Sequence, residues 1–459
     1  MNYLSPDEGL AESAPAFSEE DLALRFALRH AGDLRYVAAW SKWVQWTGSY
    51  WRFDDTKLAF NLSRKVCREA ATECNKPKIS SGLASAKTVA AVERLALADR
   101  RIAATIDQWD ADPWQLNTPQ GVVDLTTGRT RPHIPEDYIT KITAVGPRGD
   151  CPRFLAFLNR ITAGDIELVA YLQRVLGYGL TGLTREHALF FGYGTGANGK
   201  SVLLSTVSGL LGDYHKTAPI ETFTTSNGDR HPTDLASLRG ARLVTATETE
   251  EGRRWAESRI KQLTGGDTVA ARFMRQDFFE YRPAFKLIIA GNHKPSLRSV
   301  DEAIRRRFHL IPFAVTIPPE ERDADLAEKL KDEWQGILAW LIEGCLEWKA
   351  NGLRPPTAVM QATEAYLSAE DSLAAWIEDR CERSTSAWAS SSALFASWSA
   401  WANAAGENPG NSKRFAQALA SRGFSSSRKR PDGIGREGNP VRGVDGLRLI
   451  SEPSPWDER

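Results

Sequence analysis

The sequence predicts a multidomain protein in which a central α/β domain lies between an α+β N-terminal domain and a C-terminal winged-helix-like domain. Its 459 residues exceed one ordinary domain, and 42% of them are apolar, enough for several cores. In the middle of the chain, LFFGYGTGANGKSVLLSTVSGLLGDY (189–214) has the pattern of an apolar strand, a glycine-rich loop and a helix. Near the C-terminus, helical stretches precede a glycine-rich, basic segment typical of a hairpin.

Composition excludes several classes of protein. Lys plus Arg and Asp plus Glu each number 58, so the net charge is zero and nucleic acid can be bound only through local patches. The five cysteines form no CxxC pair, which argues against a zinc site or a disulfide framework and favours a reducing cytoplasm. The N-terminus lacks the pattern of a signal peptide, and no apolar run approaches the ~20 residues that cross a bilayer. We therefore expect a cytoplasmic protein with no membrane partner.

The N-terminal third predicts a loose tail and then a mixed domain. Residues 1–20 are acidic and rich in Ser and Pro, and we expect them to be disordered. The α+β domain is predicted over 21–152. KWVQWTGSYWRFDD indicates a hairpin turning at Thr47–Ser49, TKLAFNLSRKVCREAATE a helix, and ISSGLASAKT (79–88) a polar loop.

The central α/β domain is predicted over 153–350. It begins with a helix in DIELVAYLQRVLGYGL, for which Asp165 is the expected N-cap. It ends in a strongly helical stretch, DADLAEKLKDEWQGILAWLIEGCLEW, because apolar residues recur there at steps of three and four. Those residues are Leu326, Leu330, Trp334, Ile337, Leu341 and Cys345.

The C-terminal part is predicted to be a helical connector (351–384) and a winged-helix-like domain (385–459). ERSTSAWASSS (382–392) resembles a linker in composition. A helix followed by a basic, glycine-rich hairpin is the order found in a winged helix, so this domain is a candidate for DNA binding. A flexible, solvated loop explains the same charges. The candidate DNA-binding residues are Lys413, Arg414, Arg428, Lys429 and Arg430.

The glycine-rich loop matches the phosphate-binding pattern GxxxxGK[ST] at Gly194–Ser201. Glycines let backbone N–H groups converge on a phosphate, and the helix that follows aims its N-terminus at the anion. Lys200 is then expected to contact the β- and γ-phosphates, and the Ser201 hydroxyl to bind Mg²⁺. The alternative is an ordinary glycine turn between a strand and a helix. We expect the Lys200 ammonium to face solvent while the site is empty. The predicted nucleotide-binding residues are Gly194, Thr195, Gly196, Ala197, Asn198, Gly199, Lys200, Ser201 and Val202.

Two further strands end in polar residues suited to nucleotide hydrolysis. ARLVTATETEEG indicates a strand over 243–246, followed by Glu248 and Glu250. One carboxylate would hold Mg²⁺, for which Glu248 is the candidate, and the other would polarise the attacking water. FKLIIAGNHKP indicates a buried strand ending in Asn292, which would orient that water or sense the γ-phosphate. Solvated glutamates and a turn-forming asparagine are the simpler alternatives.

The stretch DEAIRRRFHLIPF places three arginines before a short apolar strand. Such a triplet is usually a solvated face. In an oligomeric ATPase an arginine here can reach the neighbouring subunit's γ-phosphate, and arginine fingers contribute ~10³–10⁵ in rate.

Taken in order, FGYGTGANGKS, ETEEG, KQLTGGDTVAARFMRQDFFEYRPAFK, GNHKP and DEAIRRRFHLIPF resemble the motif series of superfamily 3 helicases. More narrowly, they resemble the helicase part of the phage/plasmid and poxvirus primase-helicase family. The stretch WDADPWQLNTPQGVVDLTTG resembles the domain that precedes the ATPase in that family. The resemblance implies an AAA+-like P-loop ATPase that uses ATP and Mg²⁺, forms a ring, usually a hexamer, and moves along single-stranded or forked DNA. The catalytic candidates by position are Lys200, Glu248, Glu250, Asn292, Arg306 and Arg307.

The stretch TVAARF-MRQD-FFEYRP indicates two strands with a four-residue tip. The resemblance implies that this hairpin touches DNA through Arg275. A plain surface hairpin is the alternative. Fewer than 200 residues precede the phosphate loop, without zinc-type cysteines or a paired-Asp polymerase motif, so we expect a separate primase. The function expected is a replicative DNA helicase in a bacterial host cytoplasm. The second hypothesis is an ATP-regulated DNA-binding initiator or assembly factor that does not unwind.

Overall fold

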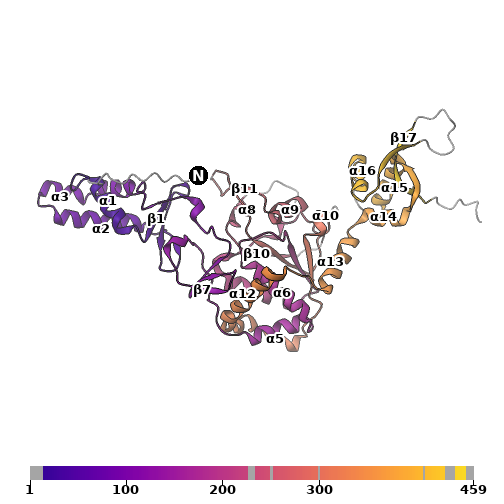
Figure 1. Ribbon diagram of the computed structural model, residues 1–459, viewed down its shortest axis with the longest axis horizontal. Coiled ribbons are helices and arrows are strands. Elements are labelled where there is room, and N and C mark those ends of the chain that lie inside the picture. Colours follow the sequence, from indigo (N-terminus) through magenta and orange to yellow (C-terminus); the bar gives the residue numbers. More distant parts are fainter. Residues whose placement is uncertain are drawn as a thin grey trace, which may run out of the picture. The chain divides into compact units, whose positions relative to one another are not determined.

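A computed structural model describes residues 14–225, 233–248, 252–275, 277–297, 300–406, 409–429 and 440–450 (Figure 1). The chain forms two compact units. The first comprises the residues up to 295 together with 306–360, and the second comprises 296–305 with the residues from 361 onward. Within the described residues, no helix has the length and apolarity needed to cross a membrane.

The N-terminal part of the first unit packs helices against one face of a small sheet of order β3-β2-β1-β4. The strands are β1 Leu34–Val37, β2 Lys42–Trp46, β3 Trp51–Phe53 and β4 Ala103–Ala104. The helices are α1 Glu19–His30, α2 Leu58–Glu73, α3 Pro77–Leu83 and α4 Ala86–Ala96. The predicted hairpin is confirmed as β2–β3, and the predicted helix as α2.

The polar loop expected over 79–88 is wrong, because α3 and the start of α4 occupy it. The Ser85 hydroxyl accepts a hydrogen bond from the backbone N–H of Thr88 at 3.2 Å and caps α4. Serines that cap a helix look like loop residues in sequence, since both uses exploit the same side-chain oxygen.

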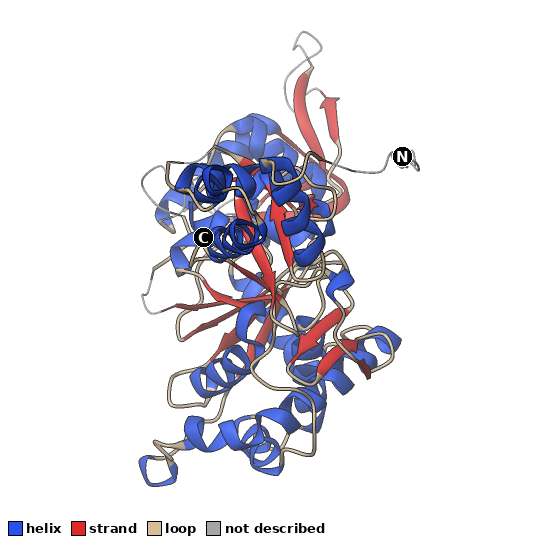
Figure 2. Ribbon diagram, turned by 90° about the vertical axis from the view of Figure 1, so that its left-hand side faces the viewer, coloured by secondary structure: helices blue, strands red, loops and turns tan. Residues whose placement is uncertain are grey.

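The central sheet is fully parallel and has the order β14-β8-β13-β10-β9. Its strands are β8 Leu189–Tyr193, β9 His215–Thr217, β10 Leu243–Glu248, β13 Lys286–Gly291 and β14 Phe308–Pro312. All six residues of β13 are buried, as expected for a parallel sheet covered by helices on both faces (Figure 2). Because parallel strands end at the same edge, the segments that follow β8, β10 and β13 lie together there. The shorter elements around the sheet are α8 Thr233–Ser237, α9 Glu257–Gly265, and the antiparallel pair β11 Val269–Ala271 and β12 Phe279–Tyr281.

A three-stranded sheet joins the N-terminal helices to the central sheet. Its strands are β5 Gln115–Thr118, β6 Gly121–Asp124 and β7 Arg129–Arg131. The buried Arg242 guanidinium, at the start of β10, donates to the carbonyls of Leu180 at 2.8 Å and Gln115 at 2.7 Å. One cation therefore fixes this sheet and a helix end to the central domain.

The helices that cover the sheet include α5 Pro152–Ile161, α6 Ile166–Gly179, α7 Lys200–Leu211 and α12 Trp334–Asn351. Asp165 caps α6 as predicted, accepting from Leu168 N at 2.9 Å. The helical stretch predicted over 323–348 is confirmed as α11 (Leu326–Lys329), a 3₁₀ turn (Leu330–Glu333) that interrupts the α-helix, and α12. The Glu333 carboxylate at the break accepts from the first N–H groups of α5, a tertiary bond that no local pattern announces.

The second unit contains helices and an antiparallel sheet of order β15-β17-β16. Its elements are α10 Glu302–Arg305, α14 Ser372–Arg380, β15 Cys381–Ser390, α15 Ser391–Ala404, α16 Ser412–Ser421, β16 Ser426–Lys429 and β17 Val441–Leu449, and α13 Thr357–Ala369 leads into it. The linker expected over 382–392 is wrong, because β15 pairs with β17 there and places Ala387 in the interior. The predicted domain boundaries and the winged-helix interpretation stay predictions.

Glycines let α6 and α12 touch at their backbones. A Cβ on Gly177 would lie 2.2 Å from Cys345 N and 2.4 Å from the Gly344 carbonyl carbon. Gly177→Ala is therefore expected to lower the midpoint of thermal unfolding, with a loss of ~1–3 kcal/mol from overpacking, although alanine favours helix. Gly82→Ala in α3 is the control, because its Cβ would meet no atom within 4 Å. It should be neutral or stabilising, and an unchanged midpoint in Gly177→Ala would contradict the backbone contact.

Candidate functional site

The loop between β8 and α7 has the geometry of a phosphate cradle. Gly196 and Gly199 have φ of 99° and 80°, a region that favours glycine. A Cβ on Gly194 would come within 2.3 Å of the Phe313 carbonyl oxygen, and one on Gly199 within 2.5 Å of Ile161. Both glycines are therefore required by close approach to neighbouring segments, and the loop ends where α7 presents its first N–H groups.

Lys200, the first residue of α7, is buried, with 7% of its surface exposed. Its ammonium donates to the carbonyl of Gly194 at 2.9 Å, to Asn198 Oδ1 at 3.0 Å and to Asn292 Oδ1 at 3.2 Å. The expectation that this ammonium faces solvent in the empty site is wrong, because these three acceptors take the place of water. Burial lowers the pKa of Lys200 to about 8.

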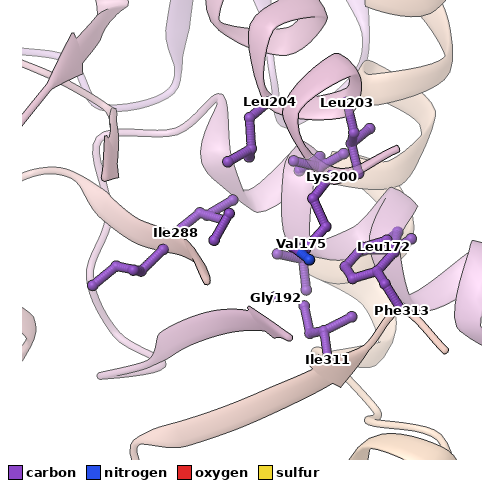
Figure 3. A pocket seen from close by; sticks show the side chains of 12 residues that line it. Leu172, Val175, Gly192, Lys200, Leu203, Leu204, Ile288, Ile311 and Phe313 are labelled. Carbon is purple, nitrogen blue, oxygen red and sulfur yellow. The ribbon is translucent and has the colours of Figure 1, made fainter. Parts of the chain in front are cut away.

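A cavity of about 20 Å³ lies beside the aliphatic part of Lys200 (Figure 3). Apolar side chains of α6, α7, β13 and β14 line it, among them Leu172, Val175 and Ile311. A space of this size holds at most a water molecule, and it offers few polar partners. It is therefore a packing gap behind the phosphate loop, and the nucleotide would bind on the loop's outer side.

The outer side of the loop is open to solvent. Thr195, Ala197 and Ser201 are exposed, while Asn198 is buried and donates to the Phe313 carbonyl at 3.3 Å. Val202, in the first turn of α7, is half-buried. The segment after β14 thus supports the loop, and Ile317 N donates to the Ala197 carbonyl at 2.8 Å. Sequence reasoning missed this support, since nothing in the sequence pairs 313–317 with the loop.

The acidic strand and the asparagine strand are neighbours. β10 extends through Glu248, beyond the expected end at Ala246, and Glu248 pairs in register with Gly291 of β13. A Cβ on Gly291 would lie 2.9 Å from the Glu248 Cβ, so this glycine allows the two strand ends to pack closely. Glu248 is buried, and Asn292 follows Gly291 directly. Glu250 lies outside the described residues.

The oxygen donors here fit a Mg²⁺ ion that shares its ligands with a nucleotide. Ser201 offers an exposed hydroxyl at the start of α7, and Glu248 offers a carboxylate at the same edge of the sheet. In the described part of the chain, no three His, Cys, Asp or Glu side chains form a metal-binding group. Mg²⁺ commonly takes one or two protein ligands, and phosphates and waters complete its coordination.

The three arginines before β14 differ in environment. Arg305 forms ion pairs with Glu364 at 3.0 Å and Asp371 at 3.6 Å, all within the second unit. Arg307 is buried in the first unit, and its Nε donates to Thr264 Oγ1 at 3.3 Å. Arg306 is exposed. Of the two predicted finger residues, Arg306 is therefore the accessible one.

The predicted hairpin is the pair β11–β12, with register Ala271 to Phe279. Its connection runs from 272 to 278, longer than the four residues expected, because the strands stop earlier. Arg275 adopts φ of 61° and lies in the turn. Met274 is 70% exposed and Phe278 62% exposed, so apolar groups flank the arginine.

The basic candidates of the second unit are exposed where the structure describes them. Lys413 and Arg414 lie in the first turn of α16. Arg428 and Lys429 lie in β16, where Lys429 pairs with Asp445 at 2.5 Å. Arg430 lies outside the described residues.

Comparisons with known proteins agree with this arrangement. A family model described as "D5 N terminal like" matches residues 23–163, and a model of a family of unknown function, DUF5906, matches 192–307. "Putative helicase L207/L206" of Acanthamoeba polyphaga mimivirus is 28% identical over 283 residues, which are 56% of this chain and 29% of that protein. "Putative helicase 184R" of Invertebrate iridescent virus 6 is 27% identical, over 60% of this chain and 33% of that protein.

The chain thus spans about a third of the length of these curated relatives. Among solved structures, the apo C-terminal region of NrS-1 is similar in fold, with a TM-score of 0.51, 10% identity, and coverage of 92% of this chain and 98% of that one. The N-terminal family match, the viral relatives and the ordered motifs of the site agree with one another. The chain therefore carries a D5 N-terminal-like region and is distantly similar to viral putative helicases of the D5, superfamily 3 type.

Proposed function

We propose that this chain is an ATP-dependent replicative DNA helicase of phage/plasmid type that translocates on single-stranded DNA as a homo-oligomeric ring. The observation that carries the proposal is the hydrogen bond from Lys200 in the phosphate loop to Asn292 at the end of β13. It joins the candidate nucleotide site to the strand that continues from the hairpin bearing Arg275. ATP binding would therefore act directly on the element proposed to hold DNA.

Phosphate binding rearranges the contacts of Lys200. The loop N–H groups and the α7 N-terminus would hold the β- and γ-phosphates. The Lys200 ammonium would turn from protein oxygens to phosphate oxygens, a stronger, charge-assisted interaction. Asn292 Oδ1 then loses its donor and becomes free to accept from the attacking water.

The two carboxylates of the acidic motif have different proposed roles. Ser201 and Glu248 would hold Mg²⁺, which neutralises charge on the phosphates when bound. Glu250 is the second carboxylate of the acidic motif, and we propose that it accepts the proton of the attacking water. Arg306 is the proposed finger on the neighbouring subunit's phosphate, because Arg307 is buried against Thr264.

DNA is proposed to contact two regions of the chain. Arg275 would hold a phosphate of the single strand in the ring, and the exposed Met274 and Phe278 beside it would contact bases. In the second unit, Lys413, Arg414, Arg428, Lys429 and Arg430 would bind the DNA backbone. A separate primase would supply primers.

Two assays test the function as a whole. ATP hydrolysis is measured with and without single-stranded DNA, and then strand displacement is measured on a forked duplex. A helicase shows stimulation and ATP-dependent displacement. Stimulation without displacement would indicate instead an ATP-regulated initiator or assembly factor, and no ATPase would overturn the nucleotide site.

Lys200→Ala is expected to abolish ATP hydrolysis while leaving the far-UV circular dichroism unchanged.

Only the ammonium form of Lys200 attracts phosphate, and the pKa of Lys200 is about 8. ATP affinity of the wild-type protein should therefore be full below pH 8 and fall by up to about tenfold per pH unit above it. Titration with a fluorescent ATP analogue between pH 7 and pH 9.5 measures this. The role of Lys200 would be contradicted if the variant hydrolysed ATP at the wild-type rate. It would also be contradicted if the ATP affinity of the wild-type protein did not change between pH 7 and pH 9.5.

Arg306→Ala is expected to lose hydrolysis but to recover it when mixed with Lys200→Ala. In a ring, an interface between the two variants can join an intact phosphate loop to an intact arginine. At equal mixing about a quarter of interfaces do so, so ATPase should return to about a quarter of the wild-type value. No recovery despite subunit exchange, followed by fluorescence energy transfer, would show that Arg306 does not act on a neighbour.

Arg275→Ala is expected to keep basal ATPase, since the phosphate loop is untouched, and to lose stimulation by single-stranded DNA and unwinding. The logarithmic salt dependence of single-strand binding should become shallower by about 0.7 for the lost phosphate contact. Arg148→Ala, which removes an exposed arginine from another loop, is the control and should behave as wild type. Full unwinding by Arg275→Ala would make the hairpin an ordinary surface turn.

A further inference from the structure

The outer face of α2 carries basic and neutral polar side chains and no acidic ones. The side chains of Asn61, Arg64, Lys65, Arg68 and Thr72 are exposed, as is Lys57 at the N-cap. The opposite face is buried against the N-terminal core through Ala59, Ser63, Val66, Cys67 and Ala70. The periodicity of a helix therefore gathers these cations on one side, along a rod of roughly 22 Å between residues 57 and 72.

The acidic residues of α2 are turned toward α1. Arg29 holds Glu69 at 2.6 Å, and Arg25 holds Glu73 at 2.7 Å. Contact with Arg29 is the main reason that the pKa of Glu69 is lowered, and the charges of Lys65 and Arg68 add to it. Within the described residues, Arg64, Lys65 and Arg68 form no ion pair of their own.

The positive charge around this face exceeds what the neutral composition of the whole chain would give. Between residues 57 and 101 the sequence has ten Lys or Arg and four Asp or Glu, whereas the whole chain has 58 of each. Arg64 and Arg68 are one turn apart, an arrangement of like charges that weakens a helix. An anionic partner bound along this face would relieve that repulsion.

The chemistry of the face fits a phosphate backbone. Arg and Lys neutralise phosphates, and Asn and Thr side chains donate to phosphate oxygens. Proteins that hold single strands add aromatic side chains on which bases stack. The outer face of α2 has none, whereas Phe278 at the hairpin turn is 62% exposed. The α2 face therefore suits a duplex, and the hairpin suits a single strand.

We propose that the outer face of α2 binds the phosphate backbone of the duplex arm of forked DNA. This inference rests on the proposed helicase function, which supplies the forked substrate. It assigns the N-terminal helices a DNA contact that is separate from the hairpin and from the second unit. Such a contact would hold the duplex while the strand is drawn through the ring.

The test compares two charge-matched variants of the full chain. Arg64→Ala/Arg68→Ala removes two cations from α2. Lys87→Ala/Arg94→Ala removes two exposed cations from the solvent face of α4, the face opposite its buried Val89 and Val92. Binding to a 30-base-pair duplex and to a 30-nucleotide thymidine single strand is measured over a series of salt concentrations. Arg64→Lys/Arg68→Lys keeps the charge and checks that any loss is electrostatic.

For the duplex, the α2 variant should bind more weakly, with a logarithmic salt slope shallower by about 1.8 for two lost phosphate contacts. Its single-strand binding and basal ATPase should stay at wild-type values, and the lysine variant should restore duplex binding. The α4 variant should bind both DNAs as wild type does.

Three results would overturn the proposal: wild-type duplex binding by the α2 variant, an equal loss in the α4 variant, or absence of duplex binding by the wild-type protein. The outcome is separable from that of the helicase function. A wild-type protein that unwinds forks while the α2 variant binds duplex normally defeats only the α2 surface. A wild-type protein that binds duplex through α2 but hydrolyses no ATP defeats only the helicase.

Discussion

The candidate site depends on one buried cation. The Lys200 ammonium sits among oxygens from the phosphate loop and from the end of β13, at distances of 2.9 to 3.2 Å. A buried charge is tolerated only when such acceptors replace water, so the loop and β13 must keep their relative positions while the site is empty. The bond to Asn292 is the one that crosses between strands. A ligand that attracts Lys200 more strongly than these oxygens therefore acts on both strands at once.

The order of the strands explains how the hydrogen bond between Lys200 and Asn292 connects the phosphate loop to other parts of the domain. β13 lies between β8, which carries the phosphate loop, and β10, which ends in Glu248. Gly291 lets β13 and β10 approach so closely that a side chain there would collide with Glu248 and Phe191. The same strand begins five residues after β12, the second strand of the hairpin. The phosphate loop, the Glu248 carboxylate and the hairpin are therefore all connected to one short segment, 279–292.

Local patterns predicted the elements that local physics determines. The strand–loop–helix unit, the cap of α6 by Asp165 and the β2–β3 hairpin follow from periodicity, capping and turn chemistry, and the structure confirms them. The failures share a cause in tertiary contacts. β15 is a strand because β17 pairs with it, and one of the three acceptors that replace water around the Lys200 ammonium is Asn292, 92 residues away. No window of sequence contains both partners of these contacts.

The distribution of charge on the surface also depends on tertiary structure, and the net charge of the chain does not reveal it. A chain with 58 cations and 58 anions has no overall attraction for DNA. Folding distributes the charges unevenly, because some anions form ion pairs: Glu69 and Glu73 pair with Arg29 and Arg25 of α1, and Glu364 and Asp371 pair with Arg305. On α2 the result is an outer face that carries cations and neutral polar side chains and no acidic ones. The positions of the acidic residues therefore matter to that surface as much as the basic residues do. A glutamate placed on the outer face of α2 would reduce the positive charge of the face even if every cation remained.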